Sequence, residues 1–205
     1  MTKQGLFLVI DGPDGAGKST QVRRLAERLV AAGREVVLLR EPGGTPLGDR
    51  VREILLDART GDLDAVTEVL LFQAARRRLV IERVRPALAE GRVVLCDRWH
   101  YATFAYQSGG GGADPAVVRL TTKLSTEGLE PRRAVILDVD ESVAAKRMAR
   151  PLDRIERRGP DYRRRVRDAF RHQLPLDPDR LVLIDGNRGE GEVAEEVWRA
   201  FRDLV

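Results

Sequence analysis

The chain has 205 residues and a net charge of +4, from 36 Lys and Arg against 32 Asp and Glu. Hydrophobic residues at 42% and charged residues at 33% indicate one soluble globular domain, and no apolar run approaches the roughly 20 residues of a membrane span. A single cysteine excludes an intramolecular disulfide. The N-terminus leads directly into an apolar run without a secretory signal, and together these features predict a cytoplasmic location.

Five short apolar runs are predicted to be strands of one sheet. They lack the polar alternation of half-exposed strands, so both faces of the sheet are expected to be covered. Helical patterns lie between the runs, and this alternation predicts an α/β fold with a parallel sheet, whose ligands gather at the carboxyl ends of the strands. The runs are Leu6–Ile10, Val36–Leu39, Val93–Cys96, Ala134–Val139 and Leu181–Ile184.

The segment after the first run, DGPDGAGKSTQ, is rich in glycine. Its residues 12–19 fit the pattern G-x-x-x-x-G-K-S between a strand and a helix. Glycines let backbone N–H groups converge, and the next helix adds unpaired N–H groups, so the loop is predicted to bind a nucleoside triphosphate. Lys18 is expected to reach the terminal phosphates and the Ser19 hydroxyl to ligate Mg²⁺. The predicted nucleotide-binding residues are Gly12, Pro13, Asp14, Gly15, Ala16, Gly17, Lys18, Ser19 and Thr20.

Two acidic residues compete for the role of metal ligand opposite this loop. Asp97 follows the third apolar run and Asp138 lies at the end of the fourth. We favour Asp97, because the adjacent Arg98 can grip a phosphate while the carboxylate organises the metal. The predicted metal ligands are therefore Ser19 and Asp97.

A basic segment follows the fourth apolar run. Between Lys146 and Arg171 there are eleven Lys or Arg against four Asp or Glu, a net charge of +7 that leaves −3 for the remainder. Arginines in a mobile lid would neutralise two phosphorylated substrates and exclude water, which favours a small kinase. A solvated helix face and a nucleic-acid footprint are the alternatives. The second expects interleaved aromatics, and only Tyr162 and Phe170 are present, so no nucleic-acid partner is expected.

Seven segments in family order resemble thymidylate kinases. They are DGPDGAGKST, REPGGT, LLFQAAR, DRWHYATFAYQ, LDVDESVAAKR, LDRIE and LVLIDG, and together they span nearly the whole chain. The resemblance implies one three-layer P-loop nucleoside monophosphate kinase domain over residues 1–205, with a five-stranded parallel sheet and a lid at about 147–160. It also implies transfer from ATP to dTMP with Mg²⁺, and a homodimer. Another nucleoside or nucleotide kinase remains the nearest alternative activity.

The resemblance also implies a role for each substrate-binding residue. Phe72 would stack on thymine and Arg76 would bind a base carbonyl, although their pattern alone favours a core residue and a surface charge. Tyr106 would lie beneath the deoxyribose, with an ordinary buried aromatic as the alternative. Arg40 and Arg98 would hold the dTMP phosphate. The remaining implied contacts are Pro42 at the base pocket, Thr103 near the base, Gln107 close by, and Asp14 near the 3′-hydroxyl and the metal.

The family supplies its catalytic arginine in one of two ways, and Gly15 stands where one arrangement has it inside the phosphate loop. The chain is thus similar to the bacterial arrangement, in which the lid supplies the arginine. The lid candidates are Arg147, Arg150 and Arg154, with Arg154 favoured and Arg150 next. The implied catalytic residues are Lys18, Arg98, Arg154, Arg150 and Asp14.

One apolar helix could supply the implied dimer interface. It is predicted over about residues 65–90, and its apolar side chains could equally belong to the core. They are Val66, Val69, Leu70, Leu79 and Val80.

Overall fold

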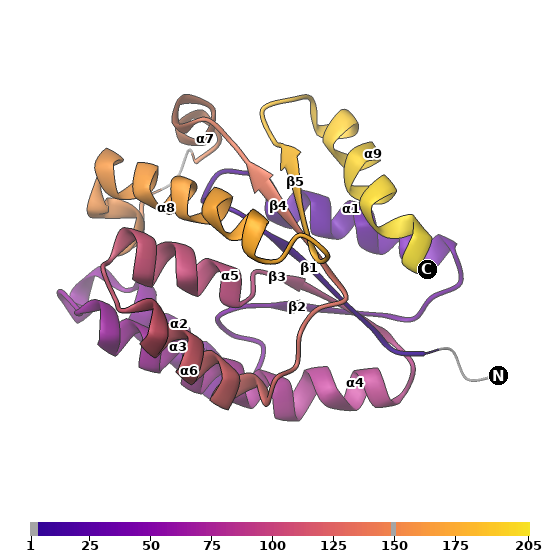
Figure 1. The fold of residues 1–205 in the computed structure, drawn as a ribbon, viewed down its shortest axis with the longest axis horizontal. Coiled ribbons are helices and arrows are strands. Elements are labelled where there is room, and N and C mark those ends of the chain that lie inside the picture. Colours follow the sequence, from indigo (N-terminus) through magenta and orange to yellow (C-terminus); the bar gives the residue numbers. More distant parts are fainter. Residues whose placement is uncertain (1–3, 149–150) are drawn as a thin grey trace.

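A computed structural model describes residues 4–148 and 151–205 and contains one five-stranded sheet (Figure 1). All neighbouring strands pair in parallel, in the order β2-β3-β1-β4-β5. The predicted α/β class and parallel sheet are confirmed, with strand ends shifted by one residue at most. The strands are β1 (Leu6–Asp11), β2 (Val36–Arg40), β3 (Val93–Asp97), β4 (Arg133–Asp138) and β5 (Leu181–Asp185).

Helices connect the strands and cover both faces of the sheet (Figure 1). Two of them continue as π-helices, α3 through Val80–Val84 into α4, and α5 through Phe104–Gly110. The helices are α1 (Lys18–Ala31), α2 (Pro46–Leu56), α3 (Ala65–Leu79), α4 (Arg85–Ala89), α5 (His100–Thr103), α6 (Pro115–Thr126), α7 (Glu141–Arg147), α8 (Pro160–Gln173) and α9 (Glu190–Phe201). Within the described residues no helix is both long and apolar enough to cross a membrane.

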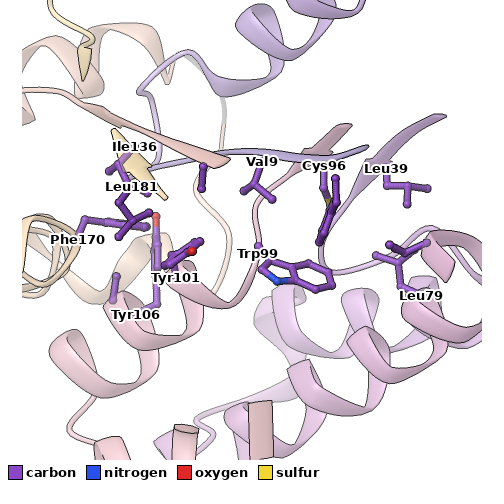
Figure 2. Packing of buried hydrophobic residues seen from close by; sticks show 14 of the residues in the cluster. Val9, Leu39, Leu79, Cys96, Trp99, Tyr101, Tyr106, Ile136, Phe170 and Leu181 are labelled. Carbon is purple, nitrogen blue, oxygen red and sulfur yellow. The ribbon is translucent and has the colours of Figure 1, made fainter. Parts of the chain in front are cut away.

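Alternate residues of the central strands β1, β3 and β4 enter one of two hydrophobic clusters, which makes the fold three-layered. On one face, Phe7 and Val9 of β1 pack with Cys96, Trp99 and other residues of the α3–α5 and α8 side (Figure 2). On the other face, alternating β1 residues pack against α1 and α9. That second cluster includes Leu8, Ile10, Leu25, Leu29, Val197 and Phe201.

The loop between β1 and α1 depends on glycine at two positions. A Cβ on Gly12, whose φ is 136°, would lie 2.4 Å from the Leu137 carbonyl oxygen of the neighbouring strand β4. Gly17 immediately precedes α1 with a φ of 91°, in the left-handed region that other residues enter at a cost. The loop can therefore turn tightly at the carboxyl end of the central strand.

Candidate active site

Lys18 is folded back over the loop that precedes it. Its Nζ donates hydrogen bonds to the carbonyl oxygens of Gly12 at 3.0 Å and Pro13 at 2.7 Å. Burial, together with the positive charge of Arg98, lowers the pKa of Lys18 to about 8. The ammonium group is thus held at the loop and largely buried, where an anionic ligand would interact with it strongly.

A first cavity opens above this loop, and we call it the donor cavity. Residues 14–20 line it, so most of the predicted nucleotide-binding segment faces one space. Gly12 and Pro13 are not among its lining residues, because their carbonyl groups lie beneath and accept from Lys18. Arg147, Gly186 and Arg188 line the opposite side.

Ser19 and Asp97, the two predicted metal ligands, lie next to each other in the lining of the donor cavity. The Ser19 hydroxyl donates to Asp97 Oδ2 at 2.7 Å, and among described residues nothing bonds the buried Asp97 Oδ1. A hydroxyl beside an unpartnered carboxylate oxygen fits the oxygen ligands that Mg²⁺ takes, with waters and phosphates filling the rest. The competing acid, Asp138, is instead bonded by the guanidinium groups of Arg167 and Arg171.

Arg98 connects the donor cavity to a second one. Its backbone φ is 76°, a strained value for arginine, and its N–H donates to the Ile10 carbonyl oxygen at 3.0 Å. The guanidinium donates to Gly12 O at 3.1 Å, pairs with Asp14 and lies 5.1 Å from the centre of the Tyr106 ring. The Tyr106 hydroxyl donates to the other Asp14 oxygen at 2.7 Å. Arg40, Asp14 and Arg98 line both cavities.

The second cavity, which we call the acceptor cavity, is lined by every predicted substrate-binding residue. They come from the end of β2 and the loop after it, from α3, from the segment directly after β3, and from α5 and the π-helix that follows it. These residues are Arg40, Pro42, Phe72, Arg76, Arg98, Thr103, Tyr106 and Gln107. The structure adds lining residues that the sequence did not single out as ligands: Glu41, Arg52, Leu56, Trp99, Ala102, Asp153, Ile155 and Glu156.

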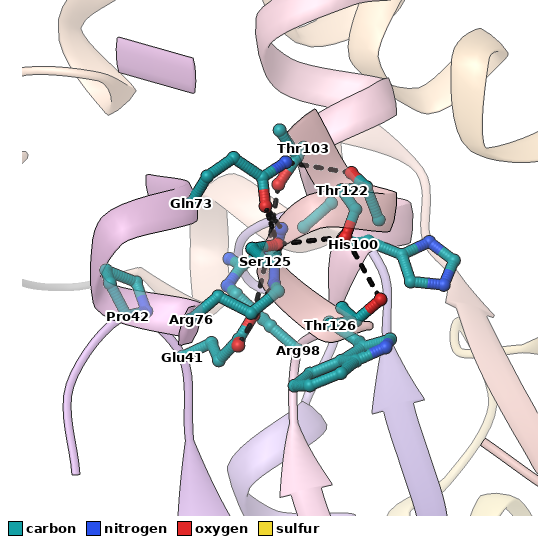
Figure 3. Close-up of polar contacts among 12 residues, drawn as sticks. Glu41, Pro42, Gln73, Arg76, Arg98, His100, Thr103, Thr122, Ser125 and Thr126 are labelled. Carbon is teal, nitrogen blue, oxygen red and sulfur yellow. Dashed lines mark hydrogen bonds and ion pairs between the residues drawn. The ribbon is translucent and has the colours of Figure 1, made fainter. Parts of the chain in front are cut away.

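Arg76 is held rigidly in the wall of the acceptor cavity (Figure 3). Its Nε donates to both Glu41 carboxylate oxygens, at 3.1 and 2.8 Å, its Nη1 to Gln73 at 2.8 Å and its Nη2 to Thr103 at 2.9 Å. Its side chain is 1% exposed, so Arg76 is not a surface charge. Burial raises the pKa of Glu41 to about 7, although Arg76 opposes that rise.

A family model described as Thymidylate kinase matches residues 10–197. The chain belongs to the thymidylate kinase family. It is 44% identical over 202 residues to a thymidylate kinase of Deinococcus radiodurans, covering 98% of each chain. It is 43% identical over 197 residues to one of Exiguobacterium sibiricum, covering 95% of this chain and 93% of that one. The crystal structure of thymidylate kinase from Ehrlichia chaffeensis aligns with a TM-score of 0.80 at 31% identity, covering 96% and 98% of the two chains.

In this thymidylate kinase family member, Arg154 of the predicted lid segment is bonded to α3 and to the end of α2. Arg154, 8% exposed, donates from Nε to Leu55 O at 2.9 Å and from Nη2 to Glu68 Oε1 at 2.6 Å, and it lines neither the donor nor the acceptor cavity. The structure therefore does not bring this predicted catalytic residue together with the others. Arg147 lines the donor cavity and donates to Gly186 O at 2.8 Å, whereas Arg150 lies outside the described residues.

Most of the arginines in the described part of the basic segment are committed to acidic partners. Arg154 and Arg158 bind Glu68, and others bind acids at the end of β4, at the start of α7 or on their own helix. These pairs are Arg163 with Glu141, Arg164 with Asp161, Arg167 with Asp138 and Asp140, and Arg171 with Asp138. The excess charge is thus largely used within the fold, which does not favour a nucleic-acid footprint.

Proposed function

We propose that this chain transfers the γ-phosphoryl group of ATP to the 5′-phosphate of dTMP, giving dTDP and ADP. A phosphate oxygen of dTMP attacks the γ-phosphorus, and the bond from that phosphorus to the oxygen bridging to the β-phosphate breaks, with its electrons leaving on ADP. The observation that carries the proposal is that Arg40, Asp14 and Arg98 line both cavities, so the two phosphate groups would meet there. Family membership supplies the identity of the substrates.

We assign the phosphate contacts to three cations. Lys18 would exchange its bonds to Gly12 O and Pro13 O for oxygens of the transferring group. Arg98 and Arg40 would hold the acceptor phosphate from the wall that the two cavities share. Asp14, bonded to both Arg98 and Tyr106, would orient these two groups and lie near the 3′-hydroxyl.

The nucleoside contacts remain proposals that the shape of the acceptor cavity supports. Phe72 would stack on thymine, with Pro42 and Thr103 beside it. Arg76 Nη1 donates one hydrogen to Gln73, which leaves its second for a base carbonyl. Tyr106 would lie beneath the deoxyribose.

Magnesium belongs to the proposal through Ser19 and Asp97. When bound there, Mg²⁺ would neutralise charge on the ATP phosphates. The Ser19 hydroxyl and the unpartnered Asp97 Oδ1 are the groups that would hold it. Ser19→Ala is expected to raise the magnesium concentration needed for half-maximal turnover, while Thr20→Ala, one residue along the loop, leaves it near the wild-type value.

The lid is proposed to supply the catalytic arginine, from among Arg147, Arg150 and Arg154. Arg154 would have to exchange its bonds to Glu68 and Leu55 O for phosphate oxygens, whereas Arg147 already lines the donor cavity. Single alanine variants separate the candidates. The catalytic arginine is the one whose loss lowers kcat by about 10²–10³-fold with little change in the KM for dTMP.

A homodimer is proposed from an apolar surface on α3 and α6, which pack against each other. Val66 and Leu70 on α3 are 44% and 55% exposed, and Leu120 and Leu124 on α6 are 61% and 67% exposed. Val69, Leu79 and Val80 are core residues instead. Sedimentation should give twice the monomer mass for the wild type and the monomer mass for Leu124→Glu.

The activity is tested by ADP release across a panel of monophosphates. We expect dTMP to support far more release than dCMP, CMP or AMP, and equal release from all four would contradict the proposal. The cytoplasm is the proposed location, because a chain whose single cysteine forms no disulfide suits a reducing compartment, and cell fractionation checks it.

A further inference from the structure

We propose that Glu68 is a positioning residue that sets which end of the Gln107 amide faces the nucleobase. This inference rests on the proposed function. Glu68 lies in the first turn of α3, its side chain is fully buried, and it lines neither cavity. Gln107 lines the acceptor cavity and is 1% exposed.

The two oxygens of Glu68 have different partners. Oε1 accepts from Arg154 Nη2 at 2.6 Å and from Arg158 Nη2, so the lid occupies one side of the carboxylate. Oε2 accepts from Gln107 Nε2 at 3.1 Å. Because a carboxylate between two guanidinium groups can only accept hydrogen bonds, Gln107 must present its NH₂ to Glu68.

This arrangement leaves the Gln107 carbonyl oxygen for a ligand. Among the described residues none donates to Gln107 Oε1, and Gln107 lines the acceptor cavity whereas Glu68 does not. Thymine carries an N–H at N3, between its two carbonyl groups, and would donate to that oxygen. Cytosine carries a bare acceptor at N3, which would face the carbonyl oxygen and be rejected. Glu68 would thus determine the choice between thymine and cytosine without touching either base.

Glu68→Gln reverses this logic while keeping the size of the side chain. The two lid arginines only donate, so the new carbonyl oxygen stays with them and the new NH₂ turns toward Gln107. Gln107 then has to accept with Oε1 and to present its own NH₂ to the cavity. The ratio of kcat/KM for dTMP over dCMP should fall by about 10- to 100-fold, the cost of one or two mismatched hydrogen bonds.

Three comparisons distinguish this role from a merely structural one. The ratio for dTMP over dUMP should stay at the wild-type value, because uracil keeps the N3–H and differs only in the methyl group. Glu68→Asp keeps an acceptor-only carboxylate and should retain the dTMP/dCMP ratio even if its kcat falls. Glu141→Gln removes another carboxylate that pairs with the basic segment, through Arg163, and should change neither ratio.

Loss of both ratios together in Glu68→Gln, or an unchanged dTMP/dCMP ratio, would overturn the proposal. If Glu68→Gln does not fold, exchange of the Gln107 side-chain NH₂ hydrogens in the wild type decides. Slow exchange without nucleotide supports the bond to Glu68, whereas protection that appears only with dTMP means that the NH₂ faces the base. Failure of the proposed function would appear separately, as a wild type that does not use dTMP.

Discussion

The donor and acceptor cavities are built in different ways. One continuous segment, residues 14–20, lines the donor cavity, and its shape comes from glycine and the start of α1. The acceptor cavity is formed by side chains from separate segments that are bonded to one another before any ligand binds, as Arg76 is to Glu41, Gln73 and Thr103. A local loop can be recognised from its sequence, whereas a preorganised network of side chains also requires the fold.

The largest expected effect on activity comes from replacing Lys18 in the donor cavity. Lys18→Ala should lower kcat by about 10³-fold, because it removes the cation expected to neutralise the transferring phosphoryl group. The melting temperature should not fall, since the lysine bonds only to backbone carbonyls and its buried charge destabilises the folded state near neutral pH. Near-normal kcat in a folded variant would show that Lys18 does not act on the transferring phosphoryl group.

Breaking the hydrogen bonds around Arg76 in the acceptor cavity should instead lower stability. Arg76→Leu leaves the buried Glu41 without its partner, and the free energy of unfolding is expected to fall by about 3–5 kcal/mol. Arg78→Leu is the matched control on the same helix, because its pair with Glu82 is exposed and should be worth less than about 1 kcal/mol. Equal losses in denaturant titrations of the two variants would mean that the network is not rigid.

Glu41 in the acceptor cavity and Lys18 in the donor cavity should also make stability depend on pH in opposite directions. The pKa of Glu41 is raised to about 7 in the folded chain from 4.5, so the folded state binds more protons and stability falls as the pH rises between these values. The pKa of Lys18 is lowered to about 8 from 10.5, so the unfolded state binds more protons and stability rises with pH in that interval. Over its full interval, each titration should change the free energy of unfolding by about 3 kcal/mol.

Unfolding titrations at fixed pH check both intervals. Glu41→Gln should remove the slope between pH 4.5 and 7 and keep the one above pH 8, and Lys18→Met should do the reverse. If the pH dependence of stability in one interval persists after the residue assigned to it has been replaced, another group titrates in that interval.

The smallest effect on activity is expected from the hydrogen bond between Tyr106 and Asp14. Tyr106→Phe removes the hydrogen bond to Asp14 but keeps the ring, so kcat/KM for dTMP should fall by about tenfold or less. The preference for dTMP over its ribose analogue should persist in Tyr106→Phe and fall in Tyr106→Ala, because the ring is expected to exclude a 2′-hydroxyl. A preference that survives in both variants would place the discrimination elsewhere.

The sequence predicted the strands and the phosphate loop because both signals are local. Apolar runs without alternation mark buried strands, and Gly12 and Gly17 adopt backbone conformations that favour glycine. The eight predicted substrate-binding residues were assigned by resemblance, since the pattern of α3 alone made Phe72 a core residue and Arg76 a surface charge. The cavity that collects them is a product of tertiary structure.

What the sequence did not predict is mostly the pairing of charges. The basic segment showed an excess of arginine but not its partners, and Glu68, which binds two of these arginines, looks like an ordinary polar residue in the first turn of a helix. Glu41 lies inside the REPGGT segment, and nothing in the sequence marks it as the partner of Arg76. An acid three or four residues from a base can be recognised in a sequence, but Glu68 and Arg154 are 86 positions apart.

Cys96 has a practical consequence for labelling. It is the single cysteine of the chain, it has no exposed surface, and burial raises the pKa of its thiol well above the usual range. Maleimides and other thiol reagents should therefore leave the folded protein unmodified. A cysteine introduced at an exposed lid position such as Arg157 would then carry a fluorophore or spin label alone, and lid motion during turnover could be followed by its signal.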